Sequence, residues 1–507
     1  MDREHRKALE LIEHQRIEIA DLKYRLSELT RRLYGSTSEK SDPDQLKLLD
    51  LEDHSKKPRS IGEGEAPLAD PSKKKRRKQE RLRKSMKDLP TTTEIIEPEE
   101  VRQDPASWKL IGEEIAEELH FEPSRCRRHQ IIRRKYARRE ELDEPQGKNV
   151  TIAPLPPRLL EGSVLTPSLL AGLITGKYCW HQPLHRQEQM MRAAGVECSR
   201  SLMCHWFEIG ADFLEPLYRS YHRKLLASDY LQIDETPIDY LAPGNGRTKK
   251  GYLWVLHNPE VGVYYQWHSG RGAQYLPELL GEEGTFRGIL QHDAYQPYLA
   301  LAKERDLAQN SCMAHIRRGF DKALQDRPEV AAWFLRHIAR LYHLEDEMRR
   351  FQLRPEQITR RRQSHSRPIL KLLQKATTKL LQKSFILPKS PLGKALRYAL
   401  SQLPLMEAWL ENGRVQIDNN LIENSIRPTK LGAKNWLFIG SERSGKKSAI
   451  LYTLVENVRR LNRDPFQYLT WVFEQIRLNP TLSDWEALLP ATWAAAHPRG
   501  NRIRQAA

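Results

Sequence analysis

The chain has 507 residues, a formal net charge of +17 and a pI near 9.5. This length is too great for one hydrophobic core, so several domains are expected. A basic excess of this size favours an anionic partner, and nucleic acid is preferred because no basic lipid-binding helix and no apolar run of about 18 residues stands out. Five scattered cysteines argue against a disulfide framework and for a reducing cytoplasm.

Residues 1–40 carry a heptad pattern that predicts a coiled coil. The apolar seam alternates steps of four and three residues, and Gln15 is its polar exception; its members are Ala8, Ile12, Gln15, Ile19, Leu22, Leu26, Leu29 and Leu33. An amphipathic helix packed on its own chain is the alternative. Self-association is favoured because Gly35 and a polar stretch separate this helix from the rest of the chain.

Residues 41–90 are typical of a flexible linker. Within it, positions 73–87 hold ten Lys or Arg against one Glu, beginning with Lys73, Lys74, Lys75, Arg76 and Arg77. A solvated charged face is the simpler interpretation. In so basic a chain, this run favours salt-sensitive contacts to DNA phosphates.

A compact segment at 91–155 precedes a helical region at 156–226. In that region one helix is predicted to end near Gly195, and a second to begin at Arg200 or Ser201 after a short turn. The spacing matches a helix-turn-helix unit that binds DNA. Because helix pairs with short turns are common, an ordinary hairpin of helices remains open.

From 227 to 460 the pattern indicates strands, then helices. Short β-branched and aromatic runs predict strands in DYLQIDETPIDYL, GYLWVLHN, VGVYYQWHS, GILQHDAYQPY and the approach to Cys312. Residues 320–412 look helical and basic, with RRR at 360–362. The stretch IDNNLIENSIRP predicts a short helix capped by Asp418 or Asn419, with Pro428 discouraging its continuation. NWLFIG looks strand-like, and 461–507 are expected to be a helical tail.

Three acids stand apart. Asp234 and Asp293 each end a predicted strand, and Glu423 lies on the short helix. Singly, each is more simply a turn or cap residue. As a set in a basic chain, they favour a site for two Mg²⁺ ions that act on phosphodiesters. Glu235 and His292 follow and precede these acids by one residue, so they should point to the opposite face.

GSERSGKKS, from Gly440, nearly matches a phosphate-binding loop. Lys447 occupies the position of the magnesium-binding hydroxyl, and no partner acid follows on a neighbouring strand. ATP hydrolysis is therefore disfavoured, and a basic glycine-rich loop that contacts a DNA phosphate is preferred.

The sequence resembles the transposases of the insertion sequence 66 family, which are bacterial DDE transposases. The resemblance covers nearly the whole chain and includes, in order, RRLYGSTSEK, IGEEIAEELHFEPSR, KYCWHQPLHRQEQMMRAAGVECSRS, DETP, HDAYQPY, CMAHIRRGF, IDNNLIENSIRP and GAKNWLFIGS. It implies an α/β multidomain protein whose ribonuclease-H-like catalytic core, at 227–460, contains a helical insertion. It also implies that Asp234, Asp293 and Glu423 are catalytic ligands of two Mg²⁺, for which Mn²⁺ can substitute.

The family usually has a Cys-based zinc module in the segment at 91–155. Here Cys126 with His120 and His129 does not supply four closely spaced ligands, so the module is expected to be degenerate and zinc is not expected. A second cluster, Cys179, His181 and His185, is more simply explained by ordinary packing.

The expected function is therefore transposition of a bacterial insertion sequence in the cytoplasm, at the nucleoid. The partners are element ends, target DNA, a second copy of the chain and any small accessory proteins of the same element, without a membrane. Further DNA contacts are expected from Arg200, Arg427, Lys434 and Lys446, and support of the site from His315, Arg317, Asn419 and Asn424. The alternatives are an inactive DNA-binding regulator and a nuclease without strand transfer.

Overall fold

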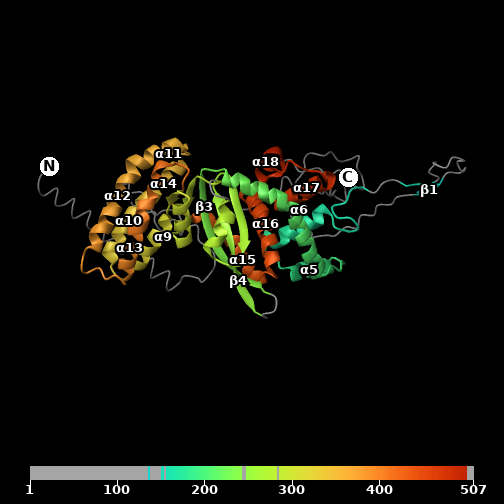
Figure 1. Cartoon of the computed structure of the whole chain (residues 1–507), viewed down its shortest axis with the longest axis horizontal. Helices are drawn as coiled ribbons and strands as arrows, with labels where there is room; N and C mark the ends of the chain where they lie inside the picture. The colour runs from blue at the N-terminus through green and yellow to red at the C-terminus, as the bar shows by residue number, and fades with distance from the viewer. Residues whose placement is uncertain (1–134, 138–149, 153–155, 243–246, 282–284, 499–507) are drawn as a thin grey trace, which may run out of the picture. The chain divides into compact units, whose positions relative to one another are not determined.

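The structure is a computed structural model that describes residues 135–137, 150–152, 156–242, 247–281 and 285–498 (Figure 1). The predicted coiled coil, the linker with Lys73–Arg77, and Cys126, His120 and His129 lie outside these residues. Of the segment at 91–155, the structure describes two short antiparallel strands, β1 (Lys135–Ala137) and β2 (Val150–Ile152). No helix in the described part is long and apolar enough to cross a membrane.

One mixed sheet of five strands organises the described chain, which is otherwise mostly helical. Its strands are β3 (Tyr230–Leu241), β4 (Thr248–Asn258), β5 (Gly262–His268), β6 (Ile289–Gln291) and β7 (Ala308–Asn310), in the order β5-β4-β3-β6-β7. Strand β4 is antiparallel to both β3 and β5, whereas β6 and β7 run parallel to β3. The α/β class is confirmed, and so are the five predicted strand positions.

The two faces of the sheet are covered by different helices. On one face, Tyr265 donates a hydrogen bond to the carbonyl of Ser425 in α15 (Asn420–Trp436) and packs against Tyr452 of α16 (Glu442–Arg460). On the other face, Trp254 packs edge-on against Tyr298 of α8 (Gln296–Glu304). The sheet centre is therefore enclosed on both sides.

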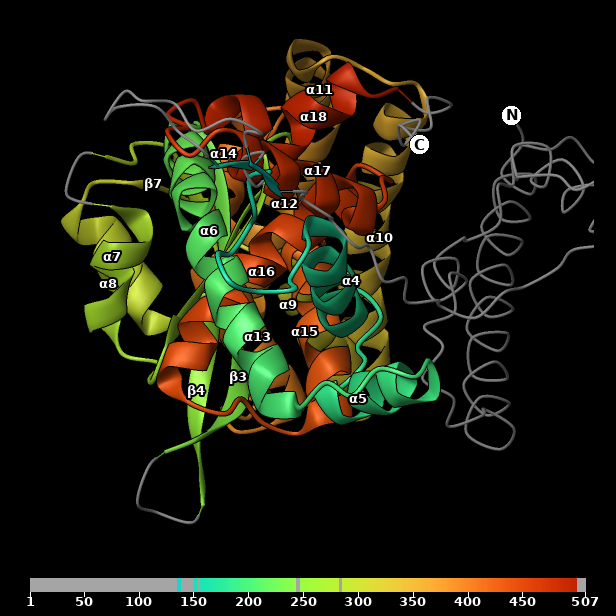
Figure 2. The same cartoon turned by 90° about the vertical axis from the view of Figure 1, so that its right-hand side faces the viewer.

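The predicted turn between two helices is confirmed. Helix α5 (Leu184–Ala193) ends before Gly195, whose positive φ of 81° suits glycine, and α6 (Arg200–Leu226) begins after Ser199 caps it. The second half of α6 runs beside α16 and against β5, as Figure 2 shows for the two helices. This helix thus belongs to the same core as the sheet.

The chain after α16 also joins that core. Helix α17 (Pro465–Leu478) packs on α4 (Pro167–Tyr178), and α18 (Pro490–Ala496) contacts α16. One hydrophobic cluster accordingly runs from Leu159 to Trp493. The segment at 461–498 is helical, as predicted, and packed into the fold.

The region predicted as a helical insertion is helical and has its own hydrophobic cluster. Its helices are α9 (Met313–Ala323), α10 (Pro328–Arg350), α11 (Pro355–Arg361), α12 (Arg367–Leu381), α13 (Pro391–Gln402) and α14 (Glu407–Glu411), gathered into one bundle in Figure 1. A π-helical segment, Arg362–Ser366, joins α11 to α12.

Two local predictions around Pro428 are wrong. Helix α15 continues through Pro428 to Trp436, so NWLFIG is no strand, and Ile439 makes only a single parallel bridge to Tyr240. Packing on β3 and β4 outweighs the proline penalty. The carbonyl that loses its donor belongs to Asn424, an exposed residue whose carbonyl can bond to water instead.

Candidate active site

Asp234 and Asp293 belong to neighbouring parallel segments of the sheet. Asp234 lies within β3, so the prediction that it ends a strand is wrong, and Asp293 lies two residues beyond the end of β6. Gln232 of β3 is in register with Gln291 of β6, and each acid follows two residues after its glutamine. Residues two apart on a strand share a face, and neighbouring strands lie about 4.8 Å apart. The register therefore brings the two acids close together where β6 ends beside β3.

Neither carboxylate has a basic partner among the described residues. Asp234 accepts a hydrogen bond at 2.8 Å from the backbone N–H of Glu235, and Asp293 accepts one at 3.1 Å from that of Tyr295. Both side chains are partly exposed. Two neighbouring acids without a basic partner favour a cation between them.

Glu423 approaches the same face from α15. It lies in the first turn, where its N–H bonds to the carbonyl of Asn419 at 3.0 Å. Asp418 fixes this helix start, because its carboxylate accepts bonds from Asn420 N–H at 3.0 Å and from Tyr342 at 2.8 Å. Of the two predicted caps, Asp418 is the one whose side chain bonds the helix start.

The three acids lie within electrostatic reach of one another. The pKa of Asp234 is raised to about 8 by burial first, then by the charge of Glu235, and further by the charges of Asp293 and Glu423. No group of three His, Cys, Asp or Glu side chains in the described part of the chain is already arranged to hold a metal ion. The acids are thus near one another but are not arranged as a complete metal-binding site.

Two buried glutamines tie the approach to α15 to the sheet. Gln232 donates to the carbonyl of Asp418 at 2.9 Å, and Gln291 donates to that of Gln416 at 3.1 Å. Both are fully buried. Because each glutamine precedes an acid by two residues, the same strands position all three acids. Neither glutamine was predicted from sequence, although Gln-X-Asp occurs twice, as QID and QHD.

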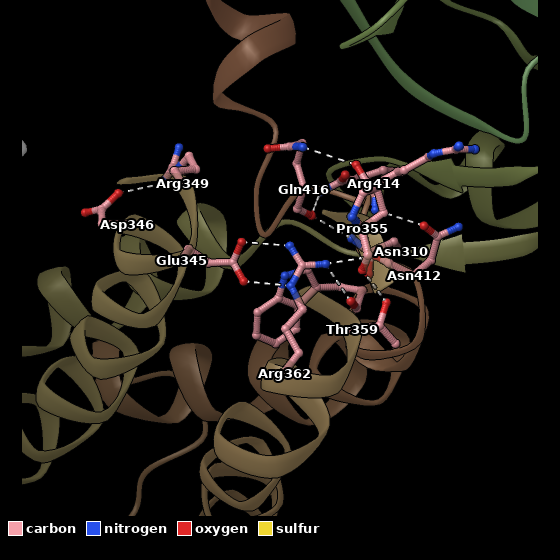
Figure 3. Close-up of polar contacts among 12 residues, drawn as sticks. Asn310, Glu345, Asp346, Arg349, Pro355, Thr359, Arg362, Asn412, Arg414 and Gln416 are labelled. Carbon is pink, nitrogen blue, oxygen red and sulfur yellow. Dashed lines mark hydrogen bonds and ion pairs between the residues drawn. The ribbon is translucent and has the colours of Figure 1, made fainter. Parts of the chain in front are cut away.

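The helical insertion holds the same approach from its other side (Figure 3). Arg362 is 2% exposed, and its guanidinium bonds both oxygens of Glu345 at 2.7 Å. It also donates to the carbonyls of Trp409 at 2.8 Å and Asn412 at 2.9 Å. These contacts fix the chain four residues ahead of Gln416, so the insertion and the sheet together hold the segment that leads to Glu423.

The opposite face carries Glu235 and His292, as predicted. The Glu235 carboxylate accepts hydrogen bonds from Arg271 and Tyr298, and its side chain is 4% exposed. His292 packs against the same Tyr298 and bonds Gln309 at 3.2 Å. These two residues anchor α8 and do not join the three acids.

Two of the predicted supporting residues carry buried polar atoms without partners. These atoms are Nδ1 of His315 and both side-chain amide atoms of Asn419. Their backbone N–H groups both bond Cys312, that of His315 to its carbonyl at 3.2 Å and that of Asn419 to its sulfur at 3.2 Å. The pKa of His315 is lowered by burial and by Arg318, while Glu423, Asp293 and Asp418 oppose the shift. Unpartnered buried polar groups beside the acids fit a site built to receive a ligand.

The other predicted contacts are spread over several elements. Asn424 and Arg427 are exposed on α15 beside Glu423, and Lys434 is exposed in its last turn. Arg317 lies on α9, within electrostatic reach of Tyr342. Arg200 pairs with Glu188 at 3.2 Å across the turn between α5 and α6.

The expected glycine-rich phosphate loop is wrong. Ser441 caps α16, and Gly445 and Lys446 lie within that helix. A Cβ at Gly445 would overlap the Trp267 ring, so this glycine allows close packing of the helix on β5. Lys447 pairs with Asp212 instead of facing a phosphate. Of the two lysines in this stretch, Lys446 is the exposed one, and the DNA contact predicted for it stays a prediction.

Comparison with known proteins gives two matching families. A profile described as Transposase IS66 family matches residues 162–447, which include all three acids. Another, described as Transposase C of IS166 homeodomain, matches residues 21–93. Two uncharacterized proteins of Sinorhizobium fredii are similar: y4jD is 31% identical over 503 residues, with 94% of this chain and 95% of y4jD covered. The second, y4qI, is 34% identical over 422 residues, with 78% and 74% covered.

Proposed function

Because the chain belongs to the IS66 transposase family, we propose that it cuts the ends of a bacterial insertion sequence and joins them to target DNA. The observation that carries this proposal is that Asp234 of β3, Asp293 just after the parallel strand β6, and Glu423 lie close enough for the charges of the last two to raise the pKa of Asp234. The charge of +17 suits a polyanionic substrate.

The three carboxylates fit hard divalent cations. Carboxylate oxygens are the ligands that Mg²⁺ and Mn²⁺ prefer, and no basic side chain competes for Asp234 or Asp293 in the described part of the chain. Asp234 and Asp293 would hold two ions between them, and Glu423 would complete the set. When bound, such ions activate an attacking oxygen and stabilise the leaving oxygen of a phosphodiester.

The protein's own contribution is to hold the acids and receive the substrate. Gln232 and Gln291 keep the chain before α15 against the sheet, which fixes the approach of Glu423. Asn419 and His315 offer unpartnered polar atoms beside the acids, where a phosphate or a ligand water would find hydrogen bonds. Arg427, Lys434 and Lys446 add exposed positive charge at or beyond α15.

The finer architecture belongs to the same proposal. A ribonuclease-H-like core is supported by the mixed sheet, in which three antiparallel strands adjoin two parallel ones, and by one acid within β3 and another just after its parallel neighbour β6. End recognition is assigned to the α5–α6 turn with Arg200 and to the basic run from Lys73 to Arg77. Pairing of two protomers is assigned to the predicted coiled coil at 1–40.

The direct test is cleavage of DNA that contains the element ends, with Mg²⁺ present. Asp234→Ala should abolish cleavage and leave DNA binding intact, because it removes a metal ligand without touching the basic surfaces. Asp239→Ala, on the exposed end of the same strand, should cut normally. If Asp234→Ala still cuts, the assignment is wrong.

A nuclease without strand transfer is the closest alternative, and the products separate it from a transposase. A transposase yields end DNA covalently joined to target DNA, whereas a nuclease yields only cut ends. An inactive DNA-binding regulator is disfavoured because all three acids are present and gathered.

A further inference from the structure

The helical insertion contains a long stretch without acids. Between Glu356 and Glu407 there is no Asp or Glu, but there are eleven Lys or Arg residues. They are Arg360, Arg361, Arg362, Arg367, Lys371, Lys375, Lys379, Lys383, Lys389, Lys394 and Arg397. Positive charges in such excess repel one another within the bundle. A bound anion would offset this repulsion.

The arginines at the start of this stretch have structural partners. Arg362 is buried against Glu345, Arg361 pairs with Glu347 at 3.6 Å, and Arg367 pairs with Glu407 at 2.6 Å. Two of the three arginines at 360–362 therefore make ion pairs within the insertion.

The remaining seven basic residues on α12, α13 and their connection are different. All seven are exposed, and no carboxylate pairs with any of them within the described residues. We call this set the α12–α13 face: Lys371, Lys375, Lys379, Lys383, Lys389, Lys394 and Arg397. Helices α12 and α13 contact each other, so the face is shared by two neighbouring elements.

Helix α12 aligns its three lysines on one side. Lys371, Lys375 and Lys379 follow at intervals of four residues, while Leu370 and Leu373 are buried on the side that packs into the bundle. Four residues of helix rise about 6 Å. Each lysine can therefore reach a different phosphate of one DNA strand.

Helix α13 connects the face to the candidate active site. Tyr398 donates a hydrogen bond to the backbone carbonyl of Asp293 at 3.1 Å, and its neighbour Arg397 is exposed. A Cβ at Gly319 of α9 would lie only 3.4 Å from that of Ala395, so α13 sits tightly on the helix that carries His315. DNA held on this face would reach the acids along α13.

We propose that the α12–α13 face binds the sugar-phosphate backbone of duplex DNA and guides it to Asp293. The inference rests on the proposed function, because it takes DNA as the substrate of the acids. Exposed Leu372 and Leu400 on these helices, with Phe385 and Leu387 in their connection, would suit a protein partner. Seven unpaired positive charges without an acid favour the phosphate backbone.

Lysine acetylation footprinting of the full-length protein tests the proposal residue by residue. The protein is treated in EDTA with and without a short duplex of arbitrary sequence, so that no cleavage is needed. Lys371, Lys375 and Lys379 should be protected several-fold by DNA. Lys303 is the internal control, because it is exposed on α8, which covers the opposite face of the sheet.

Equal labelling of the three lysines with and without DNA would overturn the proposal. Protection without DNA that grows with protein concentration would also overturn it, since the face would then bind a second copy of the chain.

A neutralised variant gives an independent measurement. The triple variant Lys371→Gln, Lys375→Gln, Lys379→Gln should lower the slope of log Kd against log salt by about 2.7, at about 0.9 per lost phosphate contact. Lys303→Gln should leave the slope unchanged. An unchanged slope in the triple variant would refute DNA binding by the α12–α13 face, while Asp234→Ala would still test the catalytic role of the acids. If Asp234→Ala still cuts DNA and the triple variant has a lowered slope, the catalytic role is refuted and DNA binding by the face is retained.

Discussion

At the scale of single residues, Asp234 is the costliest position of the site. Burial and the charges of Glu235, Asp293 and Glu423 all disfavour its ionised form, and the pKa near 8 expresses that cost. In active sites, a side chain is commonly held in such an unfavourable environment, and a bound ligand offsets the unfavourable free energy. An acid kept only for structure would find a basic partner, as Glu235 does with Arg271.

Asp234 should therefore destabilise the metal-free protein as the pH rises. Its pKa lies near 8 in the folded state and near 3.8 when unfolded, so the folded chain binds the extra proton between these values. Its stabilising contribution is complete below pH 3.8 and is lost as the pH rises through 8.

Chemical unfolding in EDTA measures this effect. Asp234→Asn should gain free energy of unfolding over wild type as pH rises from 4 to 8, by at most about 1.4 kcal/mol per pH unit. Asp239→Asn serves as the exposed control and should follow wild type. A constant difference between Asp234→Asn and wild type across this range would contradict the raised pKa.

At the scale of elements, the insertion stabilises the approach to α15 through one buried ion pair. Arg362 joins Glu345 of α10 to the carbonyls of Trp409 and Asn412. Removing one member of a buried pair leaves the other charge without compensation. The neighbouring Arg361 makes only an exposed contact to Glu347.

Arg362→Ala should thus lower the free energy of unfolding by about 3–5 kcal/mol. Arg361→Ala, the matched control one residue away, should change it by no more than about 0.5 kcal/mol. Thermal and denaturant unfolding followed by circular dichroism measure both. Similar small losses in the two variants would show that the Arg362 cluster does not hold the insertion together.

The elements themselves were largely predictable from sequence. Alternation and β-branched runs located the strands, and Gly195 with Ser199 marked the turn between α5 and α6. The failures have tertiary causes. Pro428 is tolerated because α15 packs on the sheet, and GSERSGKKS is helical because Gly445 fits against Trp267. Neither contact can be deduced from local propensity.

At the scale of the whole molecule, the sheet gathers acids that lie far apart in the chain. The separations are 59 residues from Asp234 to Asp293 and 130 from Asp293 to Glu423, taken as 293 − 234 and 423 − 293. The acids could be chosen from sequence because Asp234 and Asp293 follow runs that predict strands. Their proximity could not be predicted, since it depends on the register of Gln232 with Gln291 and on the packing of α15.

Domain boundaries were the least predictable feature. Sequence texture separates 156–226, 227–460 and 461–507, yet one hydrophobic cluster joins residues from all three. Helix α6, which sequence places in the first of these regions, carries buried residues along its length, from Met203 and Trp206 to Leu217 and Leu225. Composition reports local character, whereas a core depends on contacts across the chain.

The central claim is that Asp234, Asp293 and Glu423 act as one unit. Single-turnover cleavage of end-containing DNA with Mg²⁺ tests it most directly, with Glu423→Gln, Asp234→Asn and the double variant compared with wild type. Each single variant should lose at least about 10³-fold in rate, and the double variant should lose little more, because residues that act together are not additive. A near-wild-type rate in Glu423→Gln, or losses that multiply in the double variant, would contradict the claim.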